Sequence, residues 1–174
     1  MPAECRMQLL QEEKMRIIVD SSALFYGFLP DSRNEYYTSH SVLGEIRGKK
    51  MRESIELRLA MMKVQEPSHE SLAKVREIAS RTRDLSNMSS TDVEIIALAM
   101  DVGGKVMSND LAIQNVCRVG GIEYIAYRGK EIRREIEWKY RCTGCGRIYE
   151  TDRKTCPHCG NDLKRIPNRT RVIR

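Results

Sequence analysis

The chain has 174 residues, which is enough for one ordinary domain and a small additional module. Its 41% hydrophobic and 31% charged residues are typical of a globular protein, and no apolar run approaches the ~20 residues that a membrane span requires. Glu12, Glu13 and Lys14 interrupt the apolar core that a signal peptide would need, so we expect a cytoplasmic protein that does not contact membranes.

The positive charge is concentrated at the C-terminal end. Residues 139–174 contain 10 Lys/Arg and 3 Asp/Glu, whereas residues 1–138 contain 20 and 21, and together they give the net charge of +6. A basic segment indicates a polyanionic partner such as nucleic acid. A solvated basic tail is the alternative, but four cysteines within the same segment favour an ordered basic module.

Between the two ends, the sequence alternates predicted strands with predicted helices. Strands are expected at residues 16–19, 35–38, 63–66, 105–108 and 122–127, and helices begin near residues 23, 41, 68, 91 and 110. Residues 51–60 fit either type by their alternation, and their flanks favour helix. Alternating elements predict βαβ units and a mostly parallel sheet with right-handed crossovers.

One helix has the clearest pattern in the chain. It is preceded by residues 84–90, which we interpret as a linker. Thr91 to Glu94 is interpreted as its capping box, and Gly103 ends it. Its residues are apolar on almost every side, which predicts a fully buried helix.

Acidic residues follow two of the predicted strands. Asp20 comes directly after three branched apolar residues, and Asp110 lies just past the fourth strand. Open parallel sheets bind ligands at the carboxyl ends of their strands, so these two acids meet if their strands are neighbours. Asp92 lies in the first turn of its helix, and Glu45 lies on a helix that would pack against the sheet.

Several carboxylates in one place require a cation or a shared proton. Sites rich in carboxylate oxygens suit Mg²⁺ or Mn²⁺, and such an ion activates water and neutralises a phosphate. Taken singly, each acid also has a structural interpretation. Asp20, Asp92 and Asp110 suit helix N-termini, and Glu45 suits a solvated helix face.

The C-terminal segment holds two Cys-x-x-Cys pairs, which are Cys142 with Cys145 and Cys156 with Cys159. In a reducing compartment this spacing predicts a metal site, and four thiolates predict one closed, tetrahedral structural Zn²⁺. Gly146 and Gly160 follow the pairs, as the tight turns of such a site favour. A redox role and His158 as a ligand are the alternatives.

Basic and aromatic residues surround these cysteines. We expect RNA phosphates to be contacted by Arg141, Arg147, Arg153, Lys154, Lys164 and Arg165. Trp138, Tyr140 and Tyr149 either stack on bases or cover the small core of the module.

Residues 17–23, 38–45, 89–99 and 108–110 together resemble the PIN-domain ribonucleases. The order and spacing of Asp20, Glu45, Asp92 and Asp110 match the acidic quartet of that family, which implies that these four residues are catalytic and hold Mn²⁺ or Mg²⁺. Many members have threonine where this chain has Ser108, so the hydroxyl is kept.

With its cysteine module, the chain resembles the Nob-type endonucleases of ribosome biogenesis, in their archaeal form. The resemblance implies an α/β protein, a PIN-like α/β/α sandwich with a mostly parallel sheet, plus a small C-terminal zinc ribbon. It implies an endoribonuclease that cleaves single-stranded precursor rRNA at the 3′ end of the small-subunit rRNA, leaving a 3′-hydroxyl and a 5′-phosphate. The implied partner is the pre-ribosomal small subunit, and no small-molecule cofactor is expected.

Two alternative functions remain open. A toxin-type PIN ribonuclease would share the acidic quartet, but such enzymes usually lack a zinc ribbon. A non-catalytic RNA-binding assembly factor would keep the ribbon and carry a damaged quartet. The expected organisation is an N-terminal extension (1–14), a nuclease domain (15–130), a linker (131–138), a zinc ribbon (139–166) and a basic tail (167–174).

Overall fold

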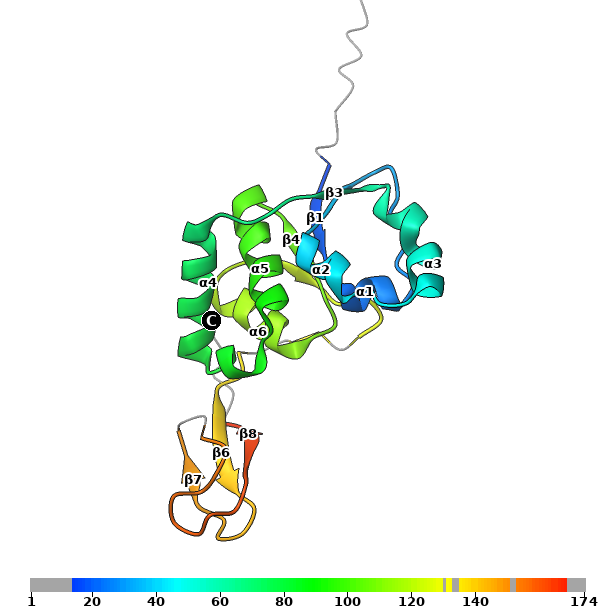
Figure 1. Cartoon of the computed structure of the whole chain (residues 1–174). Coiled ribbons are helices and arrows are strands. Elements are labelled where there is room, and N and C mark those ends of the chain that lie inside the picture. The colour runs from blue at the N-terminus through cyan, green and yellow to red at the C-terminus, as the bar shows by residue number, and fades with distance from the viewer. Residues whose placement is uncertain (1–13, 130, 133–134, 151–152, 169–174) are drawn as a thin grey trace, which may run out of the picture.

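The computed structural model describes residues 14–129, 131–132, 135–150 and 153–168 (Figure 1). Most of the expected N-terminal extension and basic tail lie outside these residues. The larger sheet contains β1 (Arg16–Val19), β2 (Glu35–Thr38), β3 (Met62–Val64), β4 (Lys105–Met107) and β5 (Tyr124–Ile125). Its order is β3-β2-β1-β4-β5 and its pairings are parallel, which confirms the predicted parallel α/β sheet.

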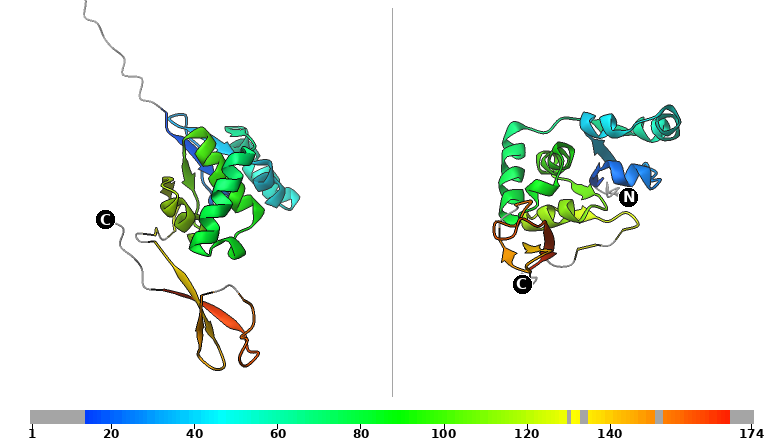
Figure 2. Two further views of the ribbon diagram at one scale, coloured as in Figure 1. Left: turned by 90° about the vertical axis from the view of Figure 1, so that its left-hand side faces the viewer. Right: turned by 60° about the horizontal axis from the view of Figure 1, so that its bottom comes forward.

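Helices flank this sheet (Figures 1 and 2). They are α1 (Ser21–Phe25), α2 (His40–Glu45), α3 (Lys49–Leu59), α4 (His69–Thr82), the 3₁₀ helix η1 (Leu85–Asn87), α5 (Ser90–Val102) and α6 (Leu111–Val119). The ambiguous segment 51–60 is therefore helical as far as Leu59. Helix α5 contacts β1 and β4, and α4 packs against α5.

The strand order reverses between β1 and β4. Chain connections proceed from β1 through β2 to β3 on one side and from β4 to β5 on the other. This is the switch point at which open α/β sheets bind ligands. Two strands differ from prediction: β5 is limited to Tyr124–Ile125, since an edge strand has one neighbour to pair with, and β3 begins at Met62 and ends at Val64.

Buried apolar side chains of β1 and α5 form the centre of the core. Ile18, Val19, Ile95, Ile96 and Leu98 have no exposed surface. Each such side chain contributes about 1.5–3 kcal/mol when it is removed from water. The continuous apolar sequence of β1 and the apolar surround of α5 therefore have the buried environments that their patterns predict.

The capping box of α5 differs from the predicted one. The Ser89 hydroxyl accepts from the Asp92 amide at 3.1 Å, and the Asp92 carboxylate accepts from the Ser89 amide at 2.6 Å. Thr91 and Glu94 have the same spacing, but the cap lies two residues earlier, at Ser89, and Thr91 is buried inside the helix. Asp92, a predicted site residue, is therefore part of the helix cap.

Gly104 marks a close approach between the start of β4 and β1. A Cβ atom at this position would lie 2.6 Å from Ile18 Cδ1 and 2.7 Å from the Arg16 carbonyl oxygen. We expect Gly104→Ala to lower the free energy of unfolding by about 1–3 kcal/mol, because backbone must move to admit the methyl group. Urea denaturation measures this change.

Gly44→Ala is the matched control for that substitution. Gly44 lies inside α2, and a Cβ atom there would have no neighbour within 4 Å. We expect it to raise the free energy of unfolding by about 0.5–1 kcal/mol through helix propensity. Equal effects of the two substitutions would contradict the steric explanation.

The C-terminal residues form a separate antiparallel sheet, which we call the cysteine module (residues 138–168). It contains β6 (Trp138–Cys142), β7 (Ile148–Tyr149) and β8 (Leu163–Pro167) in the order β7-β6-β8. Short strands are predicted by the sequence at Tyr140–Arg141 and at Arg147–Tyr149, within or beside β6 and β7, but β8 is not, because its charged residues lack a clear alternation. Among the described residues, no helix is long and apolar enough to cross a bilayer.

Candidate active site and metal centre

The predicted acids at the ends of β1 and β4 lie on adjacent strands. Val19 pairs with Met107, and the Asp20 amide donates to the Met107 carbonyl oxygen at 3.1 Å. Asp20 and the segment Ser108 to Asp110 therefore leave the sheet side by side. This meets the condition under which sequence analysis expected the two carboxylates to approach.

The Asp20 carboxylate is only 4% exposed and is held by hydroxyl groups. Its Oδ2 accepts from Ser22 Oγ and Ser108 Oγ, both at 2.7 Å, and its Oδ1 accepts from Ser21 Oγ at 3.4 Å. Asp20 does occupy the N-cap position of α1, but its side chain makes no capping hydrogen bond, so capping does not account for the carboxylate. Within the described residues, the hydrogen-bond partners of this carboxylate are hydroxyl groups, and no lysine or arginine forms an ion pair with it.

Two serines connect the ends of β1 and β4. Ser22 Oγ accepts from the Asn109 amide at 3.2 Å, and Ser108 Oγ accepts from the Asp110 amide at 3.1 Å. Ser22 was absent from the predicted site residues. Its signal in the sequence is the pair of hydroxyl residues that directly follows Asp20.

Asp92 and Asp110 are each held by helix-capping bonds through one oxygen. Asp92 Oδ2 accepts from the Ser89 amide, and Asp110 Oδ1 accepts from the amides of Ala112 and Ile113 at 2.6 and 3.3 Å. Within the described structure, the second oxygen of each carboxylate accepts no hydrogen bond. Capping therefore fixes these side chains and leaves one oxygen of each for a ligand.

The acids also influence one another electrostatically. Burial raises the pKa of Asp92, and the charges of Asp20 and Asp110 raise it further, although hydrogen bonds from Ser89 oppose the shift. In the part of the chain that the structure describes, none of these three acids forms an ion pair with lysine or arginine. Uncompensated negative charge and free carboxylate oxygens together fit a hard divalent cation.

Glu45 is the least constrained of the four predicted acids. It ends α2, is exposed, and makes no hydrogen bond or ion pair with another described residue. Helix α2 packs against α5, which carries Asp92. The carboxylates do not form a compact shell here: over the described ranges, four cysteines form the group of potential ligands whose donor atoms all lie within 4.8 Å.

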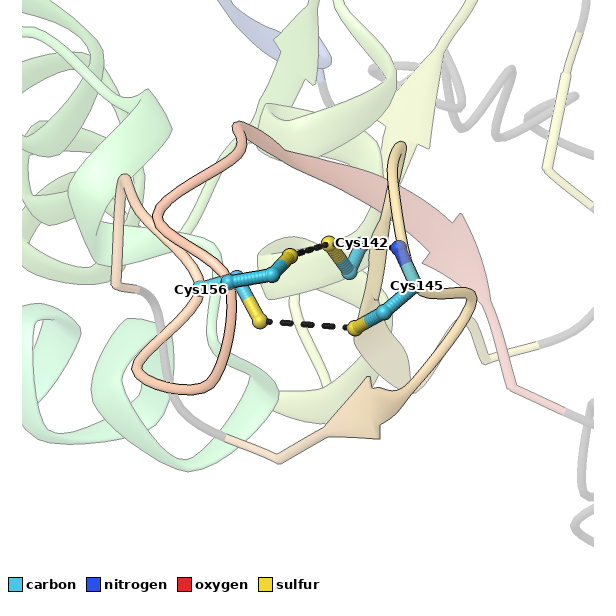
Figure 3. Close-up of side chains that lie close together, drawn as sticks. Cys142, Cys145 and Cys156 are labelled. Atoms are coloured by element: carbon cyan, nitrogen blue, oxygen red, sulfur yellow. Dashed lines mark hydrogen bonds between the residues drawn. The ribbon is translucent and has the colours of Figure 1, made fainter.

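Those cysteines are Cys142, Cys145, Cys156 and Cys159, and Figure 3 shows sulfurs of the two pairs facing one another. Cys142 Sγ lies 3.4 Å from Cys159 Sγ, and Cys145 Sγ lies 3.7 Å from Cys156 Sγ. Four sulfurs placed tetrahedrally at Zn–S distances of ~2.3 Å would be about 3.8 Å apart. The four side chains therefore fit a zinc ion, and His158 is not part of the group.

Backbone amides surround the sulfurs as the pattern predicts. The amides of Gly144 and Cys145 each lie 3.4 Å from Cys142 Sγ. Gly146 and Gly160 have φ angles of +71° and +72°, the left-handed region that favours glycine. These turns let each pair present its sulfurs to one point.

Protonation of the cysteines also favours a bound cation. Burial opposes ionisation of Cys156, but hydrogen bonds from the Tyr149 hydroxyl and nearby amides lower its pKa to about 6. The Arg147 amide favours the Cys145 thiolate, yet burial and the neighbouring sulfurs raise its pKa to about 11. Four sulfurs this close ionise together only when a cation is present. All four are free cysteines, so the structure gives no support to a disulfide-based role.

Five of the six predicted RNA contacts are exposed on the module, namely Arg141, Arg147, Arg153, Lys154 and Lys164. Arg165 is the exception, because its guanidinium forms an ion pair with the buried Asp84. Of the three aromatic residues, Tyr140 follows the alternative of covering the core, and Trp138 instead contacts Arg165. Tyr140 is 7% exposed, and the Trp138 ring lies beneath Arg165 at 3.8 Å from the ring centroid.

Acids at the switch point of a parallel sheet, joined to a basic metal-binding module, are typical of a metal-dependent enzyme that acts on nucleic acid. Residues 17–102 match the PIN domain of ribonuclease. Ribonuclease VapC1 of Thermoplasma acidophilum is 35% identical over 158 residues, covering 91% of this chain and 81% of that protein. Endoribonuclease Nob1 of Pyrococcus abyssi is 33% identical over 162 residues, covering 91% and 98%. The 20S-pre-rRNA D-site endonuclease of Saccharomyces cerevisiae is 30% identical over 99 residues, covering 54% and 22%.

The chain belongs to the PIN-domain ribonucleases, in the group that includes the archaeal endoribonuclease Nob1 proteins. The family resemblance of the four sequence segments is thereby confirmed. So is the predicted fold class, a PIN-like α/β domain followed by a four-cysteine module that fits a zinc ribbon. PIN nucleases use divalent metal ions, in agreement with the donor set at the sheet edge.

Proposed function

We propose that this chain cleaves single-stranded precursor rRNA at the 3′ end of the small-subunit rRNA, as a metal-dependent endoribonuclease. The observation that carries the proposal is the buried Asp20 carboxylate at the β1–β4 switch point, fixed by Ser22 and Ser108 beside Asp92 and Asp110. Similarity to the Nob1 proteins along nearly their whole length supports an RNA substrate, and the name of the yeast relative supports precursor rRNA.

In this proposal Asp20, Glu45, Asp92 and Asp110 hold one or more Mn²⁺ or Mg²⁺ ions. A bound ion supplies activated water and charge neutralisation at the scissile phosphate. The serine hydroxyls orient the Asp20 carboxylate, and the capping bonds of Asp92 and Asp110 occupy one oxygen of each and leave the other for the ion.

The cysteine module supplies the second half of the proposed function. A structural zinc held by its four cysteines keeps the module folded. The exposed basic residues Arg141, Arg147, Arg153, Lys154 and Lys164 then contact the phosphates of single-stranded RNA within the pre-ribosomal small subunit. The positive charge at this end of the chain supports that role.

Cleavage of an RNA that spans the 3′ end of small-subunit rRNA tests the proposal. With Mn²⁺ present, we expect cutting by the wild type and a loss of about 10²-fold or more for Asp20→Asn, because the amide removes one negative metal ligand. Asp31→Asn is the matched control, because Asp31 pairs with Arg33 in the turn before β2, at the opposite end of the strands. Gel analysis of labelled RNA gives the rates.

The other outcomes separate the rival functions. Equal cleavage by wild type and Asp20→Asn contradicts the catalytic assignment, and no cleavage by either favours an RNA-binding assembly factor. Equal cleavage of unrelated structured RNAs favours a toxin-type ribonuclease. The presence of the cysteine module does not by itself distinguish a Nob1 endoribonuclease from a VapC ribonuclease. The match to VapC1 covers 91% of this chain and so includes most of the module.

A further inference from the structure

Asp84 is a fully buried carboxylate in a segment that the sequence indicated as a linker. It follows α4, directly precedes η1, and has no exposed surface. Carboxylates are almost never fully buried unless they are paired. The linker interpretation is therefore wrong for Asp84, whose buried charge must be satisfied by other groups of the protein.

Three donors from distant parts of the chain converge on Asp84. Asn115 of α6 donates through Nδ2 to Oδ2 at 2.7 Å, and Trp138 donates through Nε1 to Oδ1 at 3.0 Å. Arg165 donates to the same Oδ1 and completes an ion pair. Two of the three donors belong to the cysteine module, on β6 and β8. The buried Asp84 carboxylate of the nuclease domain is therefore satisfied largely by the module.

The contact is reciprocal. Arg83 donates through Nη1 to the Trp138 carbonyl oxygen at 2.7 Å, and Arg165 donates to the Arg83 carbonyl oxygen at 3.3 Å. The Arg165 guanidinium also lies over the Trp138 ring, 3.8 Å from its centroid. Each side thus orders a side chain of the other, which a loosely tethered module would not do.

The chain between the two parts is held on α6 as well. Asn115 accepts from the Ile136 amide at 2.7 Å and donates to the Ile136 carbonyl oxygen at 2.8 Å. Gln114 accepts from the Ile132 amide at 2.8 Å and donates to the Ser108 carbonyl oxygen at 3.1 Å. Helix α6 therefore supports both the connecting segment and the segment that carries the candidate site.

We propose that Asp84, Trp138 and Arg165 form a latch that locks the cysteine module in one orientation on the nuclease domain. Given the function proposed above, Asp84 is a positioning residue that sets the distance between the RNA-contacting basic residues and the acids at the sheet edge. The latch depends on the carboxylate. An asparagine would offer one acceptor oxygen to three donors and would direct an NH₂ group against one of them.

Asp84→Asn in the full, zinc-loaded chain tests the latch. Backbone ¹⁵N relaxation should give one rotational correlation time for the wild type and two for the variant, one for residues 14–129 and a shorter one for the module. Trp138 is the only tryptophan. Its emission should therefore shift to longer wavelength, and acrylamide should quench it more strongly in the variant.

Two further variants keep the test decisive. Arg165→Gln changes no residue of the nuclease domain and should separate the two correlation times in the same way, so it decides the matter if Asp84→Asn fails to fold. Glu150→Gln is the control, because the Glu150 carboxylate is 66% exposed at 3.7 Å from Arg83 and should leave both readouts unchanged. A single correlation time in both latch variants, or two in the wild type, would overturn the proposal.

Cleavage kinetics connect the latch to function. We expect the latch variants to raise KM for long RNA about tenfold, because two tethered sites no longer share one geometry, and to leave kcat unchanged. An unchanged KM would refute the positioning role of Asp84. If the wild type cleaves no RNA, the function proposed above fails, while relaxation and fluorescence still decide whether the latch exists.

Discussion

Removal of zinc should unfold the cysteine module while the five-stranded sheet persists. The module has three short strands and a small set of buried side chains, which are Tyr140, Cys142 and Cys156. Units below ~40 residues rarely fold without metals or disulfides, and without a cation the four sulfurs cannot all ionise, so nothing holds the two pairs together. The larger core consists of residues outside the module, so it does not depend on the metal directly.

Metal analysis and NMR spectroscopy together measure this effect. We expect about one zinc per chain, and after chelation we expect the amide signals of residues 138–168 to collapse toward random-coil positions. Cys156→Ser should behave like the chelated protein. Cys117→Ala is the control, because Cys117 is buried in α6 outside the cluster and its loss should leave the zinc content unchanged. A dispersed module spectrum without zinc would contradict the four-thiolate site.

Unfolding of the cysteine module should also lower the stability of the nuclease domain, through Asp84. Unfolding of β6 and β8 removes two of the three donors from a carboxylate that has no exposed surface. Breaking a buried ion pair from one side costs about 3–5 kcal/mol, so the nuclease domain should become less stable although it keeps its fold. This makes zinc content a determinant of the stability of the whole chain.

Local patterns were sufficient for much of the fold. Three adjacent branched residues before Asp20 suit one environment, a parallel strand buried on both faces, and β1 is such a strand. The apolar surround of α5 and the two Cys-x-x-Cys pairs are equally local signals. They predicted the central helix and the four-sulfur cluster without any knowledge of tertiary contacts.

The features that the sequence could not predict depend on distant partners. The local sequence around Asp84 indicates a loop. Its partners Asn115, Trp138 and Arg165 lie 31, 54 and 81 positions away, so no local pattern predicts that Asp84 is buried. The cap of α5 had two candidates with the same spacing, and local preference does not choose between them. Glu45 keeps its place in the proposed metal site through family resemblance alone, because no described contact fixes its side chain.

Ser108→Ala should weaken the proposed metal site by about 10–100-fold in apparent Mn²⁺ affinity, the usual effect of removing a group that orients a ligand. Ser108 is 1% exposed, and its hydroxyl donates to Asp20 Oδ2 at 2.7 Å while it accepts from the Asp110 amide at 3.1 Å. One atom therefore couples two of the acids. Its loss leaves the Asp20 carboxylate buried with fewer donors and releases the start of the Asp110 segment.

Titration of Mn²⁺ by calorimetry and in the cleavage assay would measure the effect, with thermal unfolding as a check on folding. Ser108→Thr keeps the hydroxyl and should retain most of the affinity, so the pair separates loss of the hydrogen bonds from a general disturbance of β4. Ser54→Ala is the outer control, because the Ser54 hydroxyl donates to the Met51 carbonyl oxygen on the exposed helix α3. If Ser108→Ala bound Mn²⁺ as tightly as the wild type, the hydroxyls around Asp20 would be structural groups, and the metal would have to be held without their help.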